Sequence, residues 1–152
     1  MDKHYLTWKD FDNLCTSLHH DIRQYEREQN IKFDGIVALL RGGAIPGIWL
    51  SHNMNLPMRA IGLKSYEDTQ QTDGIELYNN IGNELKDFIE NKAIIFVDDI
   101  CDSGRTYSCI KDLCGLDYKN IFVTLHCAKD AYYTPDIFAA KSNRWIVYPW
   151  EP

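Results

Sequence analysis

Short apolar runs alternate with amphipathic stretches along this chain of 152 residues. Each run of about five apolar residues predicts a strand that is buried on both faces, as in a parallel sheet. Apolar residues spaced three, four and seven apart predict helices that pack by one face. Strands are expected at 36–40, 58–63, 93–97 and 121–125, and helices from Thr7 to about Asn30 and at 44–53, 85–89 and 107–114. This order predicts a single α/β domain, residues 1–152, with a mainly parallel, twisted sheet flanked by helices.

The composition indicates which kinds of partner the protein binds and in which cellular compartment it is found. The formal net charge is −6, so the basic excess typical of nucleic-acid-binding proteins is absent. No apolar run reaches the length of a membrane span, and the first residues lack a signal-peptide core. The five cysteines form no Cys-x-x-Cys pair, which is typical of free thiols in a reducing compartment. We therefore expect a cytoplasmic protein that binds neither nucleic acid nor membrane.

Three carboxylates follow the apolar run 93–97. Asp98 and Asp99 come directly after it, Asp102 comes three residues later, and the loop 103–106 leads into the next helix. In open α/β sheets, ligands bind beyond the carboxyl ends of the strands and beside helix N-termini. Backbone N–H groups of a tight Ser-Gly turn suit a phosphate, while the acids suit sugar hydroxyls or Mg²⁺. The pattern indicates a sugar-phosphate site; the alternative is a helix cap beside a solvated strand end.

A second glycine loop follows the strand 36–40. Arg41, Gly42 and Gly43 stand between that strand and the helix 44–53, which has Pro46 in its first turn. An arginine presents a planar set of donors that a phosphate can bind through two oxygens. The loop is therefore a second candidate anion site, and the alternative is a plain turn with a surface arginine.

Three segments resemble one enzyme family. Segment 97–106 (VDDICDSGRT) resembles the phosphoribosyl-pyrophosphate (PRPP) signature of the type I phosphoribosyltransferases. Segment 40–47 (LRGGAIPG) is similar to the pyrophosphate loop of the bacterial xanthine-guanine branch, and 145–151 (WIVYPWE) matches that branch's Trp-x-x-x-Pro-Trp-acid ending. The resemblance implies the type I fold, with a small hood built from the chain termini, and a homodimer or homotetramer. It also implies transfer of the phosphoribosyl group of PRPP to a 6-oxopurine (guanine, xanthine or hypoxanthine), with Mg²⁺.

The resemblance also implies roles for the two phosphate loops. Arg41, Gly42 and Gly43 would bind pyrophosphate, and a cis peptide is expected at Leu40–Arg41. Asp98 and Asp99 would hold ribose hydroxyls and the metal. The loop that binds the 5′-phosphate comprises Asp102, Ser103, Gly104, Arg105 and Thr106. Asp102 matches the family's carboxylate that takes the proton from purine N7, so it is the candidate general base.

The lid and the base site rest on the same resemblance. Ser65 and Tyr66 match the pair that opens the family's catalytic loop, although an ordinary hairpin there is the alternative. Lys129 matches the lysine that faces the purine 6-oxygen, although a lysine past a strand end commonly reaches into solvent. Trp145 would stack on the base, whereas Trp150 is expected to pack. Base contacts are also expected from Ile146 and from Glu151, which stands where relatives commonly have aspartate.

Other functions remain open at this stage. A phosphoribosyltransferase for another base would keep both phosphate loops and differ at Lys129 and Trp145. A non-catalytic sensor of PRPP or a nucleotide could use the same fold. A P-loop kinase and a nicotinamide enzyme are excluded, because the chain lacks both Gly-x-x-x-x-Gly-Lys-Ser/Thr and Gly-x-Gly-x-x-Gly.

Overall fold

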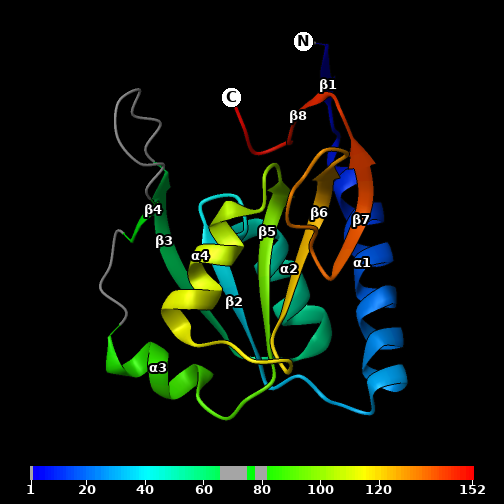
Figure 1. The fold of residues 1–152 in the computed structure, drawn as a ribbon. Helices are drawn as coiled ribbons and strands as arrows, with labels where there is room; N and C mark the ends of the chain where they lie inside the picture. Colours follow the sequence, from blue (N-terminus) through cyan, green and yellow to red (C-terminus); the bar gives the residue numbers. More distant parts are fainter. Residues whose placement is uncertain (1, 66–74, 78–81) are drawn as a thin grey trace.

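A twisted sheet with the strand order β4-β3-β2-β5-β6-β7 forms the centre of the molecule (Figure 1). The structure is a computed structural model, and it describes residues 2–65, 75–77 and 82–152. All neighbouring strands of this sheet pair in parallel except β4, which pairs antiparallel with β3 at the edge. The strands are β2 (Gly35–Leu40), β3 (Met58–Ser65), β4 (Ile75–Leu77), β5 (Ile94–Cys101), β6 (Ile121–Ala128) and β7 (Ile137–Ser142). The predicted α/β class with a mainly parallel sheet is confirmed.

Helices cover both faces of the sheet and bury alternate residues of each strand. Ile36 and Ala38 of β2 pack in one apolar core with α1 (Trp8–Gln29) and α2 (Ala44–Met54). Val37 and Leu39, one residue further along, pack in the opposite core with α3 (Asn83–Ile89) and α4 (Arg105–Cys114). Because successive side chains of a strand point to opposite faces, a strand between two helical layers must be apolar throughout. This explains the continuous apolar runs in the sequence.

Helix α1 begins and ends where its terminal residues predict. The Thr7 hydroxyl accepts a hydrogen bond from the N–H of Asp10, and the Asp10 carboxylate accepts one from the N–H of Thr7. This capping box satisfies backbone donors that the first helical turn leaves free. Asn30, with φ of 52°, ends the helix in the left-handed conformation.

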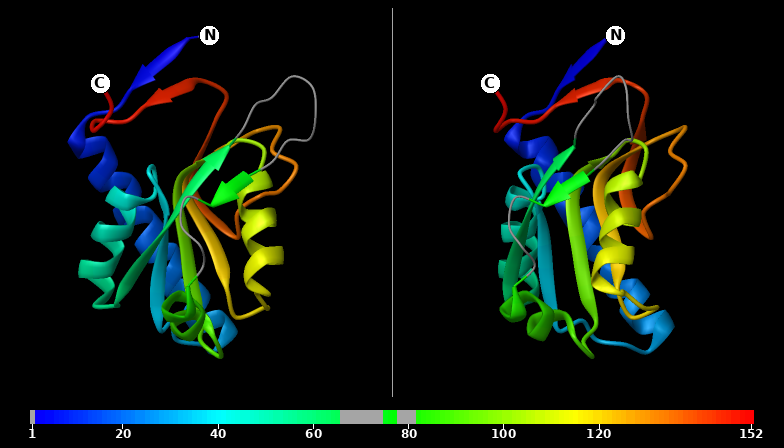
Figure 2. Two further views of the ribbon diagram at one scale, coloured as in Figure 1. Left: turned by 90° about the vertical axis from the view of Figure 1, so that its left-hand side faces the viewer. Right: turned by 60° about the vertical axis from the view of Figure 1, so that its left-hand side comes forward.

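The chain termini pair above the carboxyl ends of the central strands. β1 (Lys3–Tyr5) and β8 (Trp145–Val147) form a parallel two-stranded sheet, with Lys3 opposite Trp145 (Figure 2). Behind β8, the Trp150 ring stacks on Tyr148 at 4.7 Å and meets Phe11 edge to face at 5.3 Å. The predicted hood is confirmed, and Trp150 is a packing residue as expected.

Several elements differ from the sequence prediction, and the short strands β1, β4 and β8 were not predicted. β5 continues to Cys101, so Asp98 and Asp99 lie inside the strand, because its ladder with β6 continues past them. β7 was not predicted, since its Ala-Ala-Lys-Ser end lacks an apolar run. β3 extends to Ser65, two residues beyond the predicted strand, and β4 (Ile75–Leu77) pairs antiparallel with its end.

Two expectations about the chain as a whole can be compared with the structure. All five cysteines are free thiols, as predicted. Within the described residues, no helix is both long enough and apolar enough to cross a bilayer.

Candidate active site

The loops that follow β2 and β5 meet at the carboxyl edge of the sheet, beneath the hood (Figure 2). The β2 loop begins with the Leu40–Arg41 peptide, which is cis as predicted. Arg41 is exposed at the start of this loop, and α2 begins three residues later at Ala44. The adjacent pairing of β2 with β5 brings Arg41 to the same edge as the acids of β5.

Two glycines allow the β2 loop to lie directly against β5. A Cβ atom added at Gly42 would collide with the carboxylate of Asp99. One added at Gly43 would collide with the Val97 carbonyl oxygen and would lie 2.7 Å from that of Leu39. A side chain at either position is therefore excluded by the close approach of neighbouring atoms. The structure thus brings the Arg-Gly-Gly loop and the acid pair, which are far apart in the sequence, into contact.

Asp98 and Asp99 are half-buried and fixed by the backbone that follows each of them. Asp98 Oδ1 accepts the N–H of Asp99 at 2.9 Å, and Asp99 Oδ1 accepts the N–H of Ile100 at 2.7 Å. Burial raises the pKa of both carboxyl groups, and the neighbouring charge of Asp99 helps to raise the pKa of Asp98 well above its usual value. Such a pair favours a cationic or hydrogen-donating ligand, which offsets the cost of two buried negative charges.

The loop after β5 turns sharply into α4. Gly104 has a φ of 85°, and an added Cβ would collide with Tyr133. Ser103 Oγ accepts the N–H of Arg105 at 3.3 Å, while the Ser103 carbonyl accepts the N–H of Tyr133. Tyr133 therefore supports this loop. Asp102 is exposed beside it.

Cys101, at the end of β5, is buried. Burial raises the pKa of its thiol to about 12. The thiol therefore stays protonated near neutral pH, so Cys101 is a small packing residue and not a nucleophile.

A pocket of about 330 Å³ lies between the β5 loop and the hood. Its wall includes Asp99 and Asp102 on the sheet side and Trp145, Ile146 and Glu151 on the hood side. Trp145 is 60% exposed, so its ring is open to a ligand, whereas Ile146 is buried. The structure thus unites five of the predicted site residues around one cavity.

Two other predicted positions lie differently. Lys129 is exposed just past β6, and its neighbour Ala128, rather than Lys129 itself, lines the cavity. Ser65 is the last residue of β3, and Tyr66 lies outside the described residues.

Comparisons with known proteins identify the family. Residues 3–151 match the phosphoribosyl transferase domain. The chain belongs to this family. A xanthine-guanine phosphoribosyltransferase of Idiomarina loihiensis is 25% identical over 150 residues, which cover 97% of this chain and 86% of that protein. The predicted family and enzyme class are therefore confirmed.

Solved structures of phosphoribosyltransferases share the fold. A purine phosphoribosyltransferase from Pyrococcus horikoshii superposes with a TM-score of 0.82 at 28% identity, covering 100% of this chain and 96% of that one. The Helicobacter pylori xanthine-guanine-hypoxanthine phosphoribosyltransferase gives a TM-score of 0.79 at 23% identity, covering 98% and 94%. These likenesses confirm the predicted type I phosphoribosyltransferase fold.

Several pocket residues of this phosphoribosyltransferase were not singled out from the sequence. Ser142 and Asn143 come from the end of β7, the strand that the pattern did not predict, and Arg144 follows. Tyr148 also lines the cavity. The only available signal for Tyr148 was its place within the C-terminal motif 145–151, where it lies between the tryptophans.

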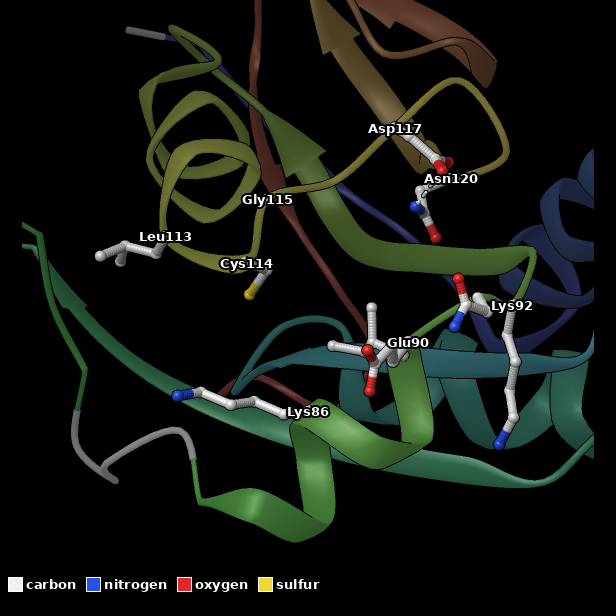
Figure 3. A pocket seen from close by; sticks show the side chains of 10 residues that line it. Lys86, Glu90, Lys92, Leu113, Cys114, Gly115, Asp117 and Asn120 are labelled. Atoms are coloured by element: carbon white, nitrogen blue, oxygen red, sulfur yellow. Dashed lines mark hydrogen bonds between the residues drawn. The ribbon is translucent and has the colours of Figure 1, made fainter.

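A second pocket, of about 400 Å³, lies at the opposite end of the sheet between α3 and α4 (Figure 3). Figure 3 shows the Cys114 sulfur pointing from the end of α4 toward α3, the Lys86 side chain running beneath Leu113 and Cys114, and the Lys92 side chain pointing away from Cys114. Asn120 is engaged in the fold itself, because it accepts the N–H of Ile94 and donates to Asp117. This pocket is separate from the phosphate loops and contains none of the predicted site residues.

His126 should make the stability of this enzyme depend on pH. The side chain is 5% exposed, and burial lowers its pKa to about 4 from an ordinary 6.5. As the pH falls from 6.5 to 4, the unfolded chain takes up a proton at this residue before the folded one does. The free energy of unfolding should therefore fall by about 3 kcal/mol over this range through His126 alone. Denaturant titrations of wild type and His126→Asn at pH 7 and pH 4 measure this effect. The difference in free energy of unfolding between the two proteins should change by about 3 kcal/mol from pH 7 to pH 4. An identical pH dependence of both proteins would contradict the prediction; His20→Asn, at an exposed helix position, is the matched control.

Proposed function

We propose that the protein transfers the 5-phosphoribosyl group of PRPP to a 6-oxopurine base, giving the nucleoside monophosphate and pyrophosphate. The observation that carries the proposal is the cavity between the β5 loop and the hood, with Asp99 and Asp102 on one side and Trp145 and Glu151 on the other. One side offers carboxylates for a sugar, and the other offers an open aromatic face for a flat base. The names of the relatives, which are purine and xanthine-guanine phosphoribosyltransferases, support the same reaction.

The two loops would hold the two phosphate ends of PRPP. Arg41 would bind the pyrophosphate through its guanidinium, together with the backbone of Gly42 and Gly43. The turn at Gly104 and the start of α4 would bind the 5′-phosphate, since helix N-termini favour anions. The residues contributing there are Asp102, Ser103, Gly104, Arg105 and Thr106. Holding both ends would fix the ribose C1 over the base and stabilise the charge of the departing pyrophosphate.

Asp98 and Asp99 suit a Mg²⁺ ion that arrives with PRPP. Both are carboxylates, the hard oxygen donors that Mg²⁺ prefers. Burial raises the pKa of both groups, and repulsion from the charge of Asp99 also raises the pKa of Asp98. A divalent cation would relieve that repulsion, so the donor set fits the metal. When bound, Mg²⁺ would neutralise charge on the leaving pyrophosphate. Asp98 and Asp99 would also accept hydrogen bonds from the ribose hydroxyls.

The base would lie against the hood. Trp145 would stack on the purine ring, and Ile146 and Glu151 would contact its edge. Lys129 would reach the 6-oxygen from the end of β6, where an ammonium stabilises an oxo group and repels the donor face of a 6-amino group. This would select 6-oxopurines over adenine.

Asp102 would accept the proton that leaves purine N7 as the new bond forms. Its exposure lets it pass that proton to solvent. Ser65 and Tyr66 would stand at the start of a loop that covers PRPP and keeps water from the reacting carbon. A homodimer or homotetramer is proposed from the family resemblance alone, and a cytoplasmic location from the five cysteines without a Cys-x-x-Cys pair.

The decisive experiment is a PRPP- and Mg²⁺-dependent assay that follows pyrophosphate release. Guanine, xanthine, hypoxanthine, adenine and uracil are tested in parallel. Turnover with at least one 6-oxopurine and none with adenine is expected. Turnover with adenine or uracil alone would contradict the base assignment. Tight PRPP binding without turnover of any base would indicate an unusual base or a sensor instead.

A further inference from the structure

Tyr148 joins three parts of the site through one buried side chain. The residue is 3% exposed, and its hydroxyl donates to the backbone carbonyl of Asp99 at 2.9 Å. The same oxygen lies 2.8 Å from Nδ1 of His126 on β6. The Tyr148 N–H donates to Glu151 Oε2 at 2.7 Å, and its ring stacks on Trp150. Tyr148 therefore contacts the acid-bearing strand, the neighbouring strand and the hood.

The direction of these hydrogen bonds follows from counting protons. A tyrosine hydroxyl has one hydrogen, and here it is given to the Asp99 carbonyl. The oxygen can then only accept from His126, so the neutral imidazole carries its hydrogen on Nδ1. Burial raises the pKa of Tyr148 and lowers that of His126, so both groups keep these neutral forms near pH 7. The chain His126–Tyr148–Asp99 is thus a connected network with a fixed direction.

This network holds Asp99 at the point where its carboxylate contacts the pyrophosphate loop. The Asp99 carboxylate already touches Gly42 of the pyrophosphate loop. Its backbone carbonyl is held from the other side by Tyr148. The residue is therefore clamped between the two, and its orientation depends on both.

We propose that Tyr148 is a positioning residue that holds Asp99 for PRPP and its metal, an inference that rests on the proposed function. Tyr148 acts through the Asp99 carbonyl, and His126 acts through Tyr148 by donating to its hydroxyl. The link to Glu151 runs through the Tyr148 backbone, so it does not depend on the hydroxyl. Removal of the hydroxyl therefore weakens the PRPP site and leaves the base site intact.

The test compares Tyr148→Phe with wild type in steady-state kinetics for both substrates. The phenylalanine keeps the ring stacking and the backbone bond to Glu151, and it loses only the bonds to Asp99 and His126. KM for PRPP should rise about tenfold, while KM for the purine stays within about twofold. The reason is that the two lost hydrogen bonds, one to Asp99 and one from His126, both act on the PRPP side of the site. Calorimetric binding of PRPP with Mg²⁺ should weaken by the same factor, which makes the comparison independent of the base used. Tyr118→Phe, which removes an exposed hydroxyl, is the matched control and should change neither constant.

Two substitutions at His126 keep the inference testable if Tyr148→Phe does not fold. His126→Asn retains an N–H donor near the position of Nδ1, and its KM for PRPP should stay within about twofold of wild type. His126→Leu removes the donor and should raise that KM about threefold. Equal KM values for PRPP in His126→Asn and His126→Leu would overturn the inference and leave the proposed function standing. The same holds if Tyr148→Phe raises KM for PRPP and KM for the purine by equal factors. A wild-type protein that neither binds PRPP nor uses it would overturn both.

Discussion

Asp102→Asn is expected to lower kcat by about 100-fold or more while KM for PRPP changes less than about threefold. Asparagine has nearly the same shape as aspartate and can still contact the ligand, but it cannot accept the proton from purine N7. Asp102 lines the cavity and is exposed, so the substitution leaves no buried charge or unsatisfied group behind. Steady-state kinetics with saturating purine measure the effect.

Asp112→Asn is the matched control for this prediction. Asp112 is exposed on α4 and does not line the cavity of the candidate site. This variant should keep wild-type kinetics. Parallel losses in kcat and PRPP binding for Asp102→Asn would contradict the role of Asp102 as a general base and would favour a role in binding.

Gly43→Ala is expected to reduce both stability and activity. The added Cβ would collide with backbone atoms, the Val97 carbonyl oxygen and that of Leu39. Val97 pairs with β2 and Leu39 pairs with β3, so neither can move without disturbing the central sheet. The free energy of unfolding should decrease by about 2 to 3 kcal/mol because of this overpacking. A displaced pyrophosphate loop should also lower kcat/KM for PRPP by about 100-fold. Denaturant unfolding and PRPP kinetics measure the two effects.

Gly82→Ala controls for the loss of a glycine. An added Cβ at Gly82 meets no atom of the described part of the chain within 4 Å, and its φ of −70° is accessible to alanine. Its effect on the free energy of unfolding should be less than about 1 kcal/mol. If Gly43→Ala is as mild as Gly82→Ala, then the loop is not pressed against β5 as the structure has it.

Local sequence signals accounted for most of the elements. Buried strands such as Gly35–Leu40 are apolar throughout because both faces are covered, and this pattern is visible without any structure. The limits of α1 follow from Thr7, Asp10 and Asn30, whose side chains or conformations act on neighbouring residues only. The end of α4 follows in the same way from Gly115, whose φ is 60°. Such signals are short-range, so one sequence is enough to find them.

The elements that the sequence missed depend on distant partners. The second half of β5 contains the polar pair Asp98 and Asp99, which remains in the strand because the ladder with β6 continues to Cys101. β7 is a strand because it lies beside β6, although its own residues carry a weak pattern. In both cases tertiary pairing overrides local preference.

Some features of the candidate site are likewise visible in the sequence, and others depend on the tertiary structure. The sequence by itself identified the candidate site residues, because Arg41, Asp98, Asp99 and Asp102 follow apolar runs in recognisable motifs. It also determined that glycines adjoin them. Only the tertiary structure decided that Gly42 touches Asp99 and that Trp145 and Glu151 face Asp102 across a cavity. Only the tertiary structure pointed to a positioning role for Tyr148, because its hydrogen-bond partners Asp99 and His126 lie 49 and 22 residues away along the chain. A motif records what a residue can do, whereas hydrogen bonds between distant segments exist only once the sheet has brought those segments together.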